Sequence, residues 1–332
     1  MKRLTKVELR RLFSRRLTAI ALLGALAVTG LMLFGTFTEA KPLSGAELTS
    51  QRAQFDQAHK EWEVNGDQQL QDCLTQQAEA QKQDPKANFG CNQMEPKWGL
   101  NWGKPEAKFT EMMPGIMLGG SYLLAFVAFV VGAGFVAAEF SSGSMANWLT
   151  FEPRRMRVYV SKLGAAGLGL IPVTVALLGL LTAGSWLIVG HLASTAGTTA
   201  TVWGDLALMG GRAVALAVAA AVAGAAMGVL LRHTAAVLGI AVGYLVLVEG
   251  VFGQALQGAR PWLLQLNFNA WLQHGAKYFI QTCKTDAQGN YNCQGVEKVL
   301  SFGHSLAYLG LLVVLTVGLA AFGVPPPRRQ LT

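Results

Sequence analysis

Six long apolar runs constrain this 332-residue chain more than any other feature. The hydrocarbon core of a bilayer is about 30 Å thick, and a helix needs about 20 apolar residues to cross it. The runs of that length are residues 17–36, 114–138, 163–190, 205–230, 235–256 and 304–324. Only 14% of the residues are charged, against about 25% in soluble domains. We therefore predict an all-α polytopic membrane protein with six transmembrane helices.

The short flanks of these runs set the orientation. Cations gather before the first run, between the second and third, between the fourth and fifth, and after the sixth. Short loops rich in Lys and Arg stay in the cytoplasm. Both termini are therefore predicted to be cytoplasmic, in the cytoplasmic membrane of a bacterium. The net charge of +8 then reflects the inner membrane face, with lipid as a partner, and no nucleic-acid partner is expected.

This topology predicts five regions along the chain. They are a cytoplasmic segment with the first helix (1–36), an outer domain (37–112), helices two to five (113–256), a second outer loop (257–303), and the last helix with a cytoplasmic tail (304–332).

The N-terminal segment has two interpretations. Basic residues before an apolar run also describe a secretory signal peptide. The apolar run is longer than the usual 7–15 residues, which favours an uncleaved first helix. Residues 2–16 would then lie along the inner membrane surface. Leu9, Leu12, Phe13 and Leu17 share one helical side, although cations interrupt the pattern.

The first outer domain is predicted to be a helical insertion between the first two transmembrane helices. Residues 46–64 and 67–83 have helical composition, with a break expected at Asn65-Gly66 and a stop at Pro85. In the second outer loop, residues 257–280 are too apolar for an ordinary exposed loop. They are expected to lie on the outer leaflet or dip into it.

All four cysteines fall in the outer segments, which fits an oxidising compartment and disulfide bonds. Local pairing gives Cys73 with Cys91 and Cys283 with Cys293, the second pair flanking a hairpin-like turn. Four cysteines allow three pairings in all. Zinc binding is the alternative, but the spacing of Cys and His residues matches no common zinc motif.

Two charged residues lie inside predicted spans, where charges are costly and often functional. At 1.5 Å per residue, Arg212 lies about 10 Å from the outer face and Glu249 about 9 Å from it. Their matching depths suggest an ion pair. The alternative is that Arg212 extends to the surface while Glu249 meets backbone or water.

Motifs of catalysis are absent from the sequence. It contains no G-x-x-x-x-G-K-[ST] phosphate loop, no His-Glu-x-x-His and no Gly-x-Ser-x-Gly. We therefore expect no enzyme activity, no metal site and no cofactor in this chain.

The polar stretch 139–162 carries the clearest family signal. It reads Glu139, then Gly143-Ser144, then Trp148-Leu149, then Pro153-Arg154-Arg155, and Lys162 at the next span. This order resembles the cytoplasmic loop of ABC-2-type permeases, the membrane subunits of ATP-driven exporters, with Ser in place of the usual Thr. Six spans with both ends inside also match that family. The long 37–112 loop does not, so the resemblance covers about three quarters of the chain.

The resemblance implies an ABC exporter permease that works as a dimer, with a second copy or a homologue, and with separate ATP-binding subunits that hold the ATP. Its coupling residues would be Glu139, Gly143, Ser144, Trp148, Phe151, Pro153, Arg154 and Arg155. A short helix anchored by Trp148 and Phe151 would sit in a cleft of the ATP-binding subunit. The alternative for the basic residues is that they only hold the loop inside and contact anionic lipid.

A second hypothesis from another class stays open at this point. The chain could be a non-transporting membrane protein whose disulfide-bonded outer loops bind or sense an external ligand.

Overall fold

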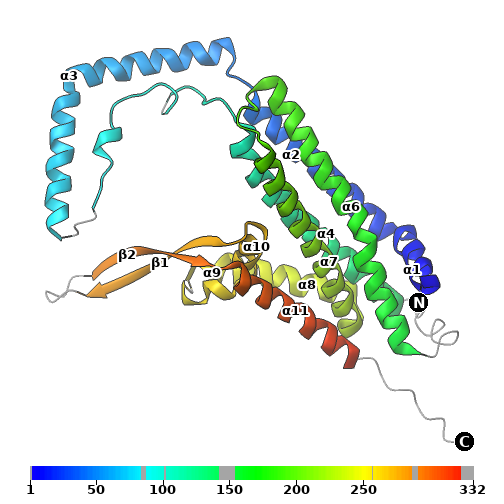
Figure 1. The fold of residues 1–332 in the computed structure, drawn as a ribbon. Coiled ribbons are helices and arrows are strands. Elements are labelled where there is room, and N and C mark those ends of the chain that lie inside the picture. The colour runs from blue at the N-terminus through cyan, green and yellow to red at the C-terminus, as the bar shows by residue number, and fades with distance from the viewer. Residues whose placement is uncertain are drawn as a thin grey trace, which may run out of the picture. The chain divides into compact units, whose positions relative to one another are not determined.

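The computed structural model describes residues 2–83, 87–100, 102–141, 154–255, 257–285 and 291–322, most of them in helices (Figure 1). The long helices are α1 (Lys2–Ser14), α2 (Arg16–Ala40), α3 (Gly45–Gln83), α4 (Phe109–Ser141), α6 (Arg155–Leu192), α7 (Ala200–Leu231) and α11 (Phe302–Phe322). The shorter elements are η1 (Cys91–Gln93), α8 (Thr234–Gly243), η2 (Tyr244–Phe252), α9 (Gly253–Ala255), η3 (Gln257–Trp262), α10 (Leu264–Leu272), β1 (Ala276–Thr285) and β2 (Tyr291–Leu300).

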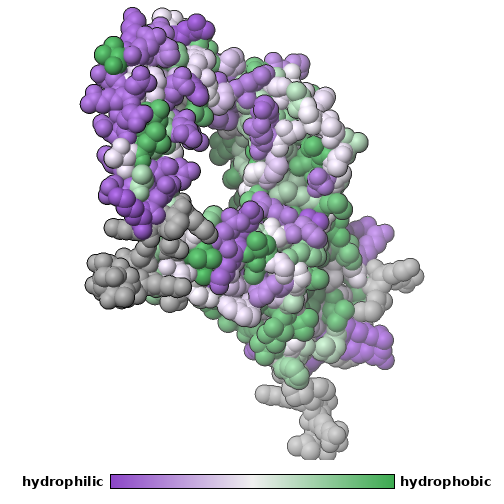
Figure 2. Space-filling model, turned by 60° about the vertical axis from the view of Figure 1, so that its left-hand side comes forward, coloured by the Kyte–Doolittle hydropathy of each residue, from purple (hydrophilic) through white to green (hydrophobic). Residues whose placement is uncertain are grey.

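Within the described residues, six helical stretches are long and apolar enough to cross a membrane, which confirms the predicted number of spans. They are Arg16–Ala40, Phe109–Phe140, Arg155–Leu192, Ala200–Leu231, Thr234–Phe252 and Phe302–Phe322. The chain divides into two compact units. Unit 1 comprises residues 1–34, 110–185 and 197–332, and unit 2 comprises 35–109 and 186–196. Hydrophobic residues gather on the surface of the spanning helices, whereas hydrophilic residues dominate the surface of α3 (Figure 2).

The core of unit 1 is formed where α4 and α7 cross. A side chain at Gly132 of α4 would collide with the backbone of Ala221 on α7. A side chain at Gly224 of α7 would collide with the carbonyl of Phe129 on α4. Small residues allow membrane helices to approach each other closely. Gly132 and Gly224 allow the backbones of α4 and α7 to come into contact. Gly228, four residues after Gly224, continues the same contact, because a side chain there would collide with the carbonyl of Ala133 on α4.

The N-terminal helix α1 is part of this bundle. Leu12 is fully buried in the main core cluster, beside Tyr159 and Leu163 of α6. A side chain at Gly169 of α6 would collide with Leu12. The missing side chain at this position therefore makes room for α1. Residues 2–16 were expected to lie along the membrane surface, and part of their apolar side packs against protein.

Among the described residues, the prediction of an all-helical chain is wrong within the 257–303 segment. Strands β1 and β2 form an antiparallel hairpin there, with Ala276 opposite Leu300 and Cys283 opposite Cys293. The strands are held by backbone hydrogen bonds, the disulfide and a cross-strand ion pair, in which Lys277 Nζ lies 2.8 Å from a Glu297 carboxylate oxygen. The hydrogen bond that the Lys277 ammonium donates to the Glu297 carboxylate raises the pKa of Lys277.

Helix α3 continues through Asn65-Gly66, where a break was predicted, but it bends sharply part-way along its length (Figure 1). Glycine lowers helix stability by only about 1 kcal/mol, so surrounding helix formers can carry the helix through it. The Trp62 ring also lies against the face of Gly66 where a side chain would stand. The helix ends at Gln83, two residues before Pro85.

The start of α3 is closed by a capping box. The Ser44 backbone N–H and hydroxyl donate to the same Glu47 carboxylate oxygen, at 2.9 and 2.7 Å. The Glu47 N–H returns a bond to the Ser44 hydroxyl. This reciprocal arrangement satisfies N–H groups that have no partner within the helix. The bonds from Ser44 lower the pKa of Glu47.

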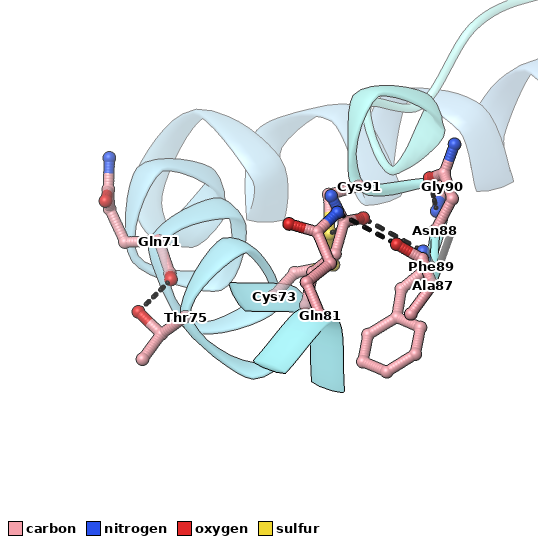
Figure 3. Close-up of a disulfide and its surroundings, with 10 residues drawn as sticks. Gln71, Cys73, Thr75, Gln81, Ala87, Asn88, Phe89, Gly90 and Cys91 are labelled. Atoms are coloured by element: carbon pink, nitrogen blue, oxygen red, sulfur yellow. Dashed lines mark hydrogen bonds between the residues drawn. A yellow bond between two sulfur atoms is a disulfide. The ribbon is translucent and has the colours of Figure 1, made fainter. Parts of the chain in front are cut away.

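Both predicted disulfides are formed. Cys73 of α3 is bonded to Cys91 of η1, with Cα atoms 5.8 Å apart, and Cys283 is bonded to Cys293. Around the first bond, the Gln81 side chain donates to the Ala87 carbonyl at 2.9 Å (Figure 3). These contacts tie the end of α3 to the segment that follows it.

Replacing Cys73 and Cys91 with serine is expected to destabilise the end of α3 by about 3 kcal/mol, because the closed loop spans 18 residues. Hydrogen exchange of the α3 amides after residue 70 would report this as faster exchange. Serine replacement of Cys283 and Cys293 is the matched control and should leave α3 unchanged. Equal exchange of α3 in both variants and the native protein would refute the stabilising role.

Candidate functional site

A cluster of buried charges lies at the base of the 139–162 stretch. Glu139 is near the end of α4 and Lys162 is in the second turn of α6, so they flank the segment that joins these two helices in the sequence. Lys162 Nζ lies 2.5 Å from one Glu139 carboxylate oxygen and 3.0 Å from a carboxylate oxygen of Glu8 in α1. Arg15, between α1 and α2, donates to the other Glu139 oxygen at 2.6 Å. We call Glu8, Arg15, Glu139 and Lys162 the ion cluster.

Burial makes the balance of the ion cluster important. The side chains of Glu8 and Lys162 are 1% exposed and that of Glu139 is 3% exposed, whereas Arg15 is 25% exposed. Two acids and two bases give a formal charge of zero, and the half-exposed guanidinium of Arg11 lies 3.8 Å from the other Glu8 oxygen at the edge of the ion cluster. Removing a charge from water costs several kcal/mol, which a close ion pair offsets only when the partners are well placed. The four side chains therefore depend on one another.

An aromatic ring completes the surroundings of the ion cluster. The Phe135 ring lies under both cations, with Lys162 Nζ 5.1 Å and the Arg15 guanidinium 5.3 Å from its centroid. Cations at this distance are attracted to the face of an aromatic ring. Phe135 is fully buried on α4, one helical turn before Glu139. The arrangement connects α1, α4 and α6 through polar and cation–π contacts.

Arg212 and Glu249 do not form the predicted ion pair, because each interacts with a different end of α10. The Arg212 guanidinium donates to the carbonyl of Leu272, the last residue of α10, at 3.1 Å. One Glu249 carboxylate oxygen accepts the N–H of Leu264, the first residue of α10, at 2.6 Å. A helix favours an anion at its N-terminus and a cation at its C-terminus. The two residues, for which the sequence predicted similar depths, therefore bind opposite ends of the same short helix.

The comparison with known families decides which kind of membrane protein this is. The profile of the family described as ABC-2 family transporter protein matches residues 10–325, nearly the whole chain. The chain belongs to the ABC-2 transporter family. No significant match was found among curated proteins or among solved structures.

Membership of the ABC-2 family assigns this chain a general role in transport. It is a multi-pass membrane protein and the membrane component of an ABC transporter, a role that is not catalytic in this family. Such components normally work with an ATP-binding subunit. The match also includes the long 37–112 segment, which the resemblance drawn from motifs had left out.

The structure describes three of the eight predicted coupling residues. Glu139 is in the ion cluster, Arg154 directly precedes α6 and is exposed, and Arg155 is the first residue of α6. Gly143, Ser144, Trp148, Phe151 and Pro153 lie outside the described residues. The coupling role of all of these residues stays a prediction.

Glu8 and Arg15 of the ion cluster were not predicted as site residues. Glu8 is the single acid among the basic residues of 2–16. Its spacing offered a signal, because it precedes the buried Leu12 by four residues and so lies on the same helical face. An acid on the apolar face of an otherwise basic helix indicates a buried cation as its partner.

Proposed function

We propose that this chain is the permease subunit of an ABC exporter. Two copies, or one copy and a homologue, would form the translocation path in a bacterial cytoplasmic membrane, with both termini in the cytoplasm. ATP would be hydrolysed by separate ATP-binding subunits that bind the 139–162 stretch. The single observation that carries this proposal is the ion cluster, which connects the two ends of that stretch to each other and to the N-terminal helix.

The ion cluster supplies a mechanical link for such coupling. A force on the loop acts on Glu139 and Lys162 together, because their side chains are 2.5 Å apart. Lys162 passes the displacement to α1 through Glu8, and Glu139 passes it to the start of α2 through Arg15. Three helices that leave the same membrane edge would then move as one body. Movements of packed elements as units are typical of transporters that alternate access.

The exposed apolar surface supports an assembly of more than one chain. The span formed by α8 and η2 and the span formed by α11 are mostly exposed within unit 1. Lipid covers part of such a surface, and a second permease is expected to cover another part. The composition of these spans, rich in Val, Leu and Gly, suits close helix packing.

Coupling can be tested by co-expressing the chain with a candidate ATP-binding subunit, chosen from neighbouring reading frames for its phosphate loop, and purifying the complex through the permease. We expect the native chain to retain that subunit. Trp148→Ala and Arg155→Glu should each reduce the retained amount several-fold, since aromatic and Arg anchors dominate such contacts. Lys298→Glu, an exposed charge reversal on β2, is the control and should not change it.

The opposite outcome is equally informative. If no ATP-binding subunit is retained and reconstituted vesicles show no ATP-dependent transport, the exporter assignment fails. The hypothesis of a sensor that uses the disulfide-bonded outer loops would then be favoured.

A further inference from the structure

An apolar cavity opens among the membrane-spanning helices of unit 1. Its volume is about 580 Å³, and its walls come from α4, α7, α8, η2, α10 and α11. Phe126 and Phe129 of α4 and Ile240 of α8 provide bulky apolar walls, and Ala219 and Ala223 of α7 leave the space between them. Small side chains on one wall and large ones on the others create room for an apolar group of substantial size.

One end of this cavity is polar. A second hollow of about 410 Å³ shares Tyr122, Leu245, Leu264 and Phe268 with the apolar cavity and adds Glu249, Gly250 and Gln265 to the lining. The Tyr122 hydroxyl lies within hydrogen-bonding distance of the Gln265 carbonyl and of Asn269 Oδ1, at 2.9 and 2.8 Å. The two hollows together therefore have an apolar body and a hydrogen-bonded, acidic head.

The π-helix η2 positions the acid at this head. Tyr244 and Glu249 are five residues apart, and in an α-helix they would point about 140° away from each other. The π-helix bonds each residue to the fifth one along, which brings these two side chains together, and the Tyr244 hydroxyl donates to Glu249 at 2.9 Å. π-Helical segments are rare and are frequent at functional sites.

Glu249 has dipolar partners but no cation. Its carboxylate accepts the N–H groups of Leu264 and Gln265 and the Tyr244 hydroxyl. In the described part of the chain no Lys or Arg nitrogen lies within 4 Å of it. Arg260 lines an adjoining hollow, but its guanidinium donates to the Phe279 carbonyl. An acid within a span that has no cationic partner attracts a cation from elsewhere.

We infer that this site binds a lipophilic organic cation, with its charged centre beside Glu249 and its apolar groups in the cavity. The inference rests on the proposed transport function, for which it names the class of cargo. A lipophilic anion is disfavoured by the carboxylate. A sugar is disfavoured because the larger cavity offers almost no hydrogen-bonding groups.

Binding of radiolabelled tetraphenylphosphonium to the full chain in phosphatidylcholine nanodiscs tests the inference. Tetraphenylborate has nearly the same shape and the opposite charge, so it serves as the competitor that isolates the charge. Because the two ions pair in solution, bound label is compared at equal concentrations of free tetraphenylphosphonium. We expect unlabelled tetraphenylphosphonium to displace the label and tetraphenylborate to leave it bound. Glu249→Gln should weaken binding at least about tenfold, the effect of losing one partly buried charge contact.

Three further variants make the result specific. Tyr244→Phe keeps the charge and should bind within about threefold of the native chain, a loss below the 1.4 kcal/mol that corresponds to tenfold. Ala223→Phe fills the cavity and should abolish binding while the carboxylate remains. Glu63→Gln removes an exposed acid of α3 and should change nothing.

The inference is overturned if Glu249→Gln binds as tightly as the native chain, if tetraphenylborate competes equally, or if the native chain does not bind the cation because lipid fills the cavity. Should Glu249→Gln fail to fold, the competition by tetraphenylborate and the Ala223→Phe variant decide the question. Binding is measured without ATP or an ATP-binding subunit. A negative binding result therefore does not affect the coupling test, and a negative coupling result does not argue against cation binding at this site.

Discussion

Replacing Lys162 with methionine is expected to lower the free energy of unfolding by about 3–5 kcal/mol, the cost of removing one partner from a buried ion pair. Methionine keeps most of the side-chain volume, so the loss reports charge more than packing. Lys162 lies between the carboxylates of Glu8 and Glu139, and all three side chains are almost fully buried. Denaturation of the purified chain in mixed micelles would show the transition at a lower denaturant concentration.

A double replacement separates charge balance from packing. Lys162→Met with Glu8→Gln leaves one acid, Glu139, and one base, Arg15, still 2.6 Å apart. This variant should recover most of the lost stability, because the cluster is neutral again. Lys298→Met on the exposed face of β2 is the control and should match the native chain. A double variant no more stable than Lys162→Met would show that the charges are not coupled.

Replacing Gly224 with valine is expected to prevent the bundle of unit 1 from forming correctly. The new side chain would overlap the carbonyl of Phe129 and approach the backbone of Ala133 on α4. Backbone atoms cannot rotate aside as a side chain can, so the cost should reach or exceed about 3 kcal/mol, the upper end for overpacked sites. Size-exclusion chromatography after extraction should show aggregated protein with little monodisperse material.

Gly239 provides a matched control for this substitution. It lies in a membrane-spanning helix, α8, and belongs to a small-residue pair of the same spacing, with Gly243. A side chain there would meet no atom within 4 Å. Gly239→Val should therefore elute like the native chain. If both variants are monodisperse and equally stable, the close approach of α4 and α7 does not hold the fold together.

The membrane-spanning helices could be predicted because one physical requirement determines them. A helix that crosses a bilayer needs a minimum number of apolar residues, and that count is visible in one stretch of sequence. The disulfides were predictable for a similar reason, since each pair lies within a single loop. Cys73 and Cys91 are 18 residues apart, and Cys283 and Cys293 are 10 apart.

The interactions between distant segments could not be predicted in the same way. Gly224 and Gly239 carry the same spacing signal, yet only Gly224 faces another helix. The partner of Glu8 is 154 residues away, and only the packing of α1 against α6 brings them together. Arg212 and Glu249 have matching depths, but the dipole of α10 supplies closer partners than either offers the other. Each of these outcomes depends on which faces pack, and periodicity alone does not specify that.

The contact between Glu8 and Lys162 sets an order of events during biosynthesis. Chains are made at roughly 5–20 residues per second, so about 8–30 s separate the two residues as they leave the ribosome. During that interval the first two spans enter the membrane, and Lys162 is not yet available to pair with Glu8. The N-terminal helix can take its final place only when the third span arrives. Packing of α1 into the bundle of unit 1 is therefore expected to follow insertion of the third span, and a chain released before that point would leave the buried face of α1 exposed.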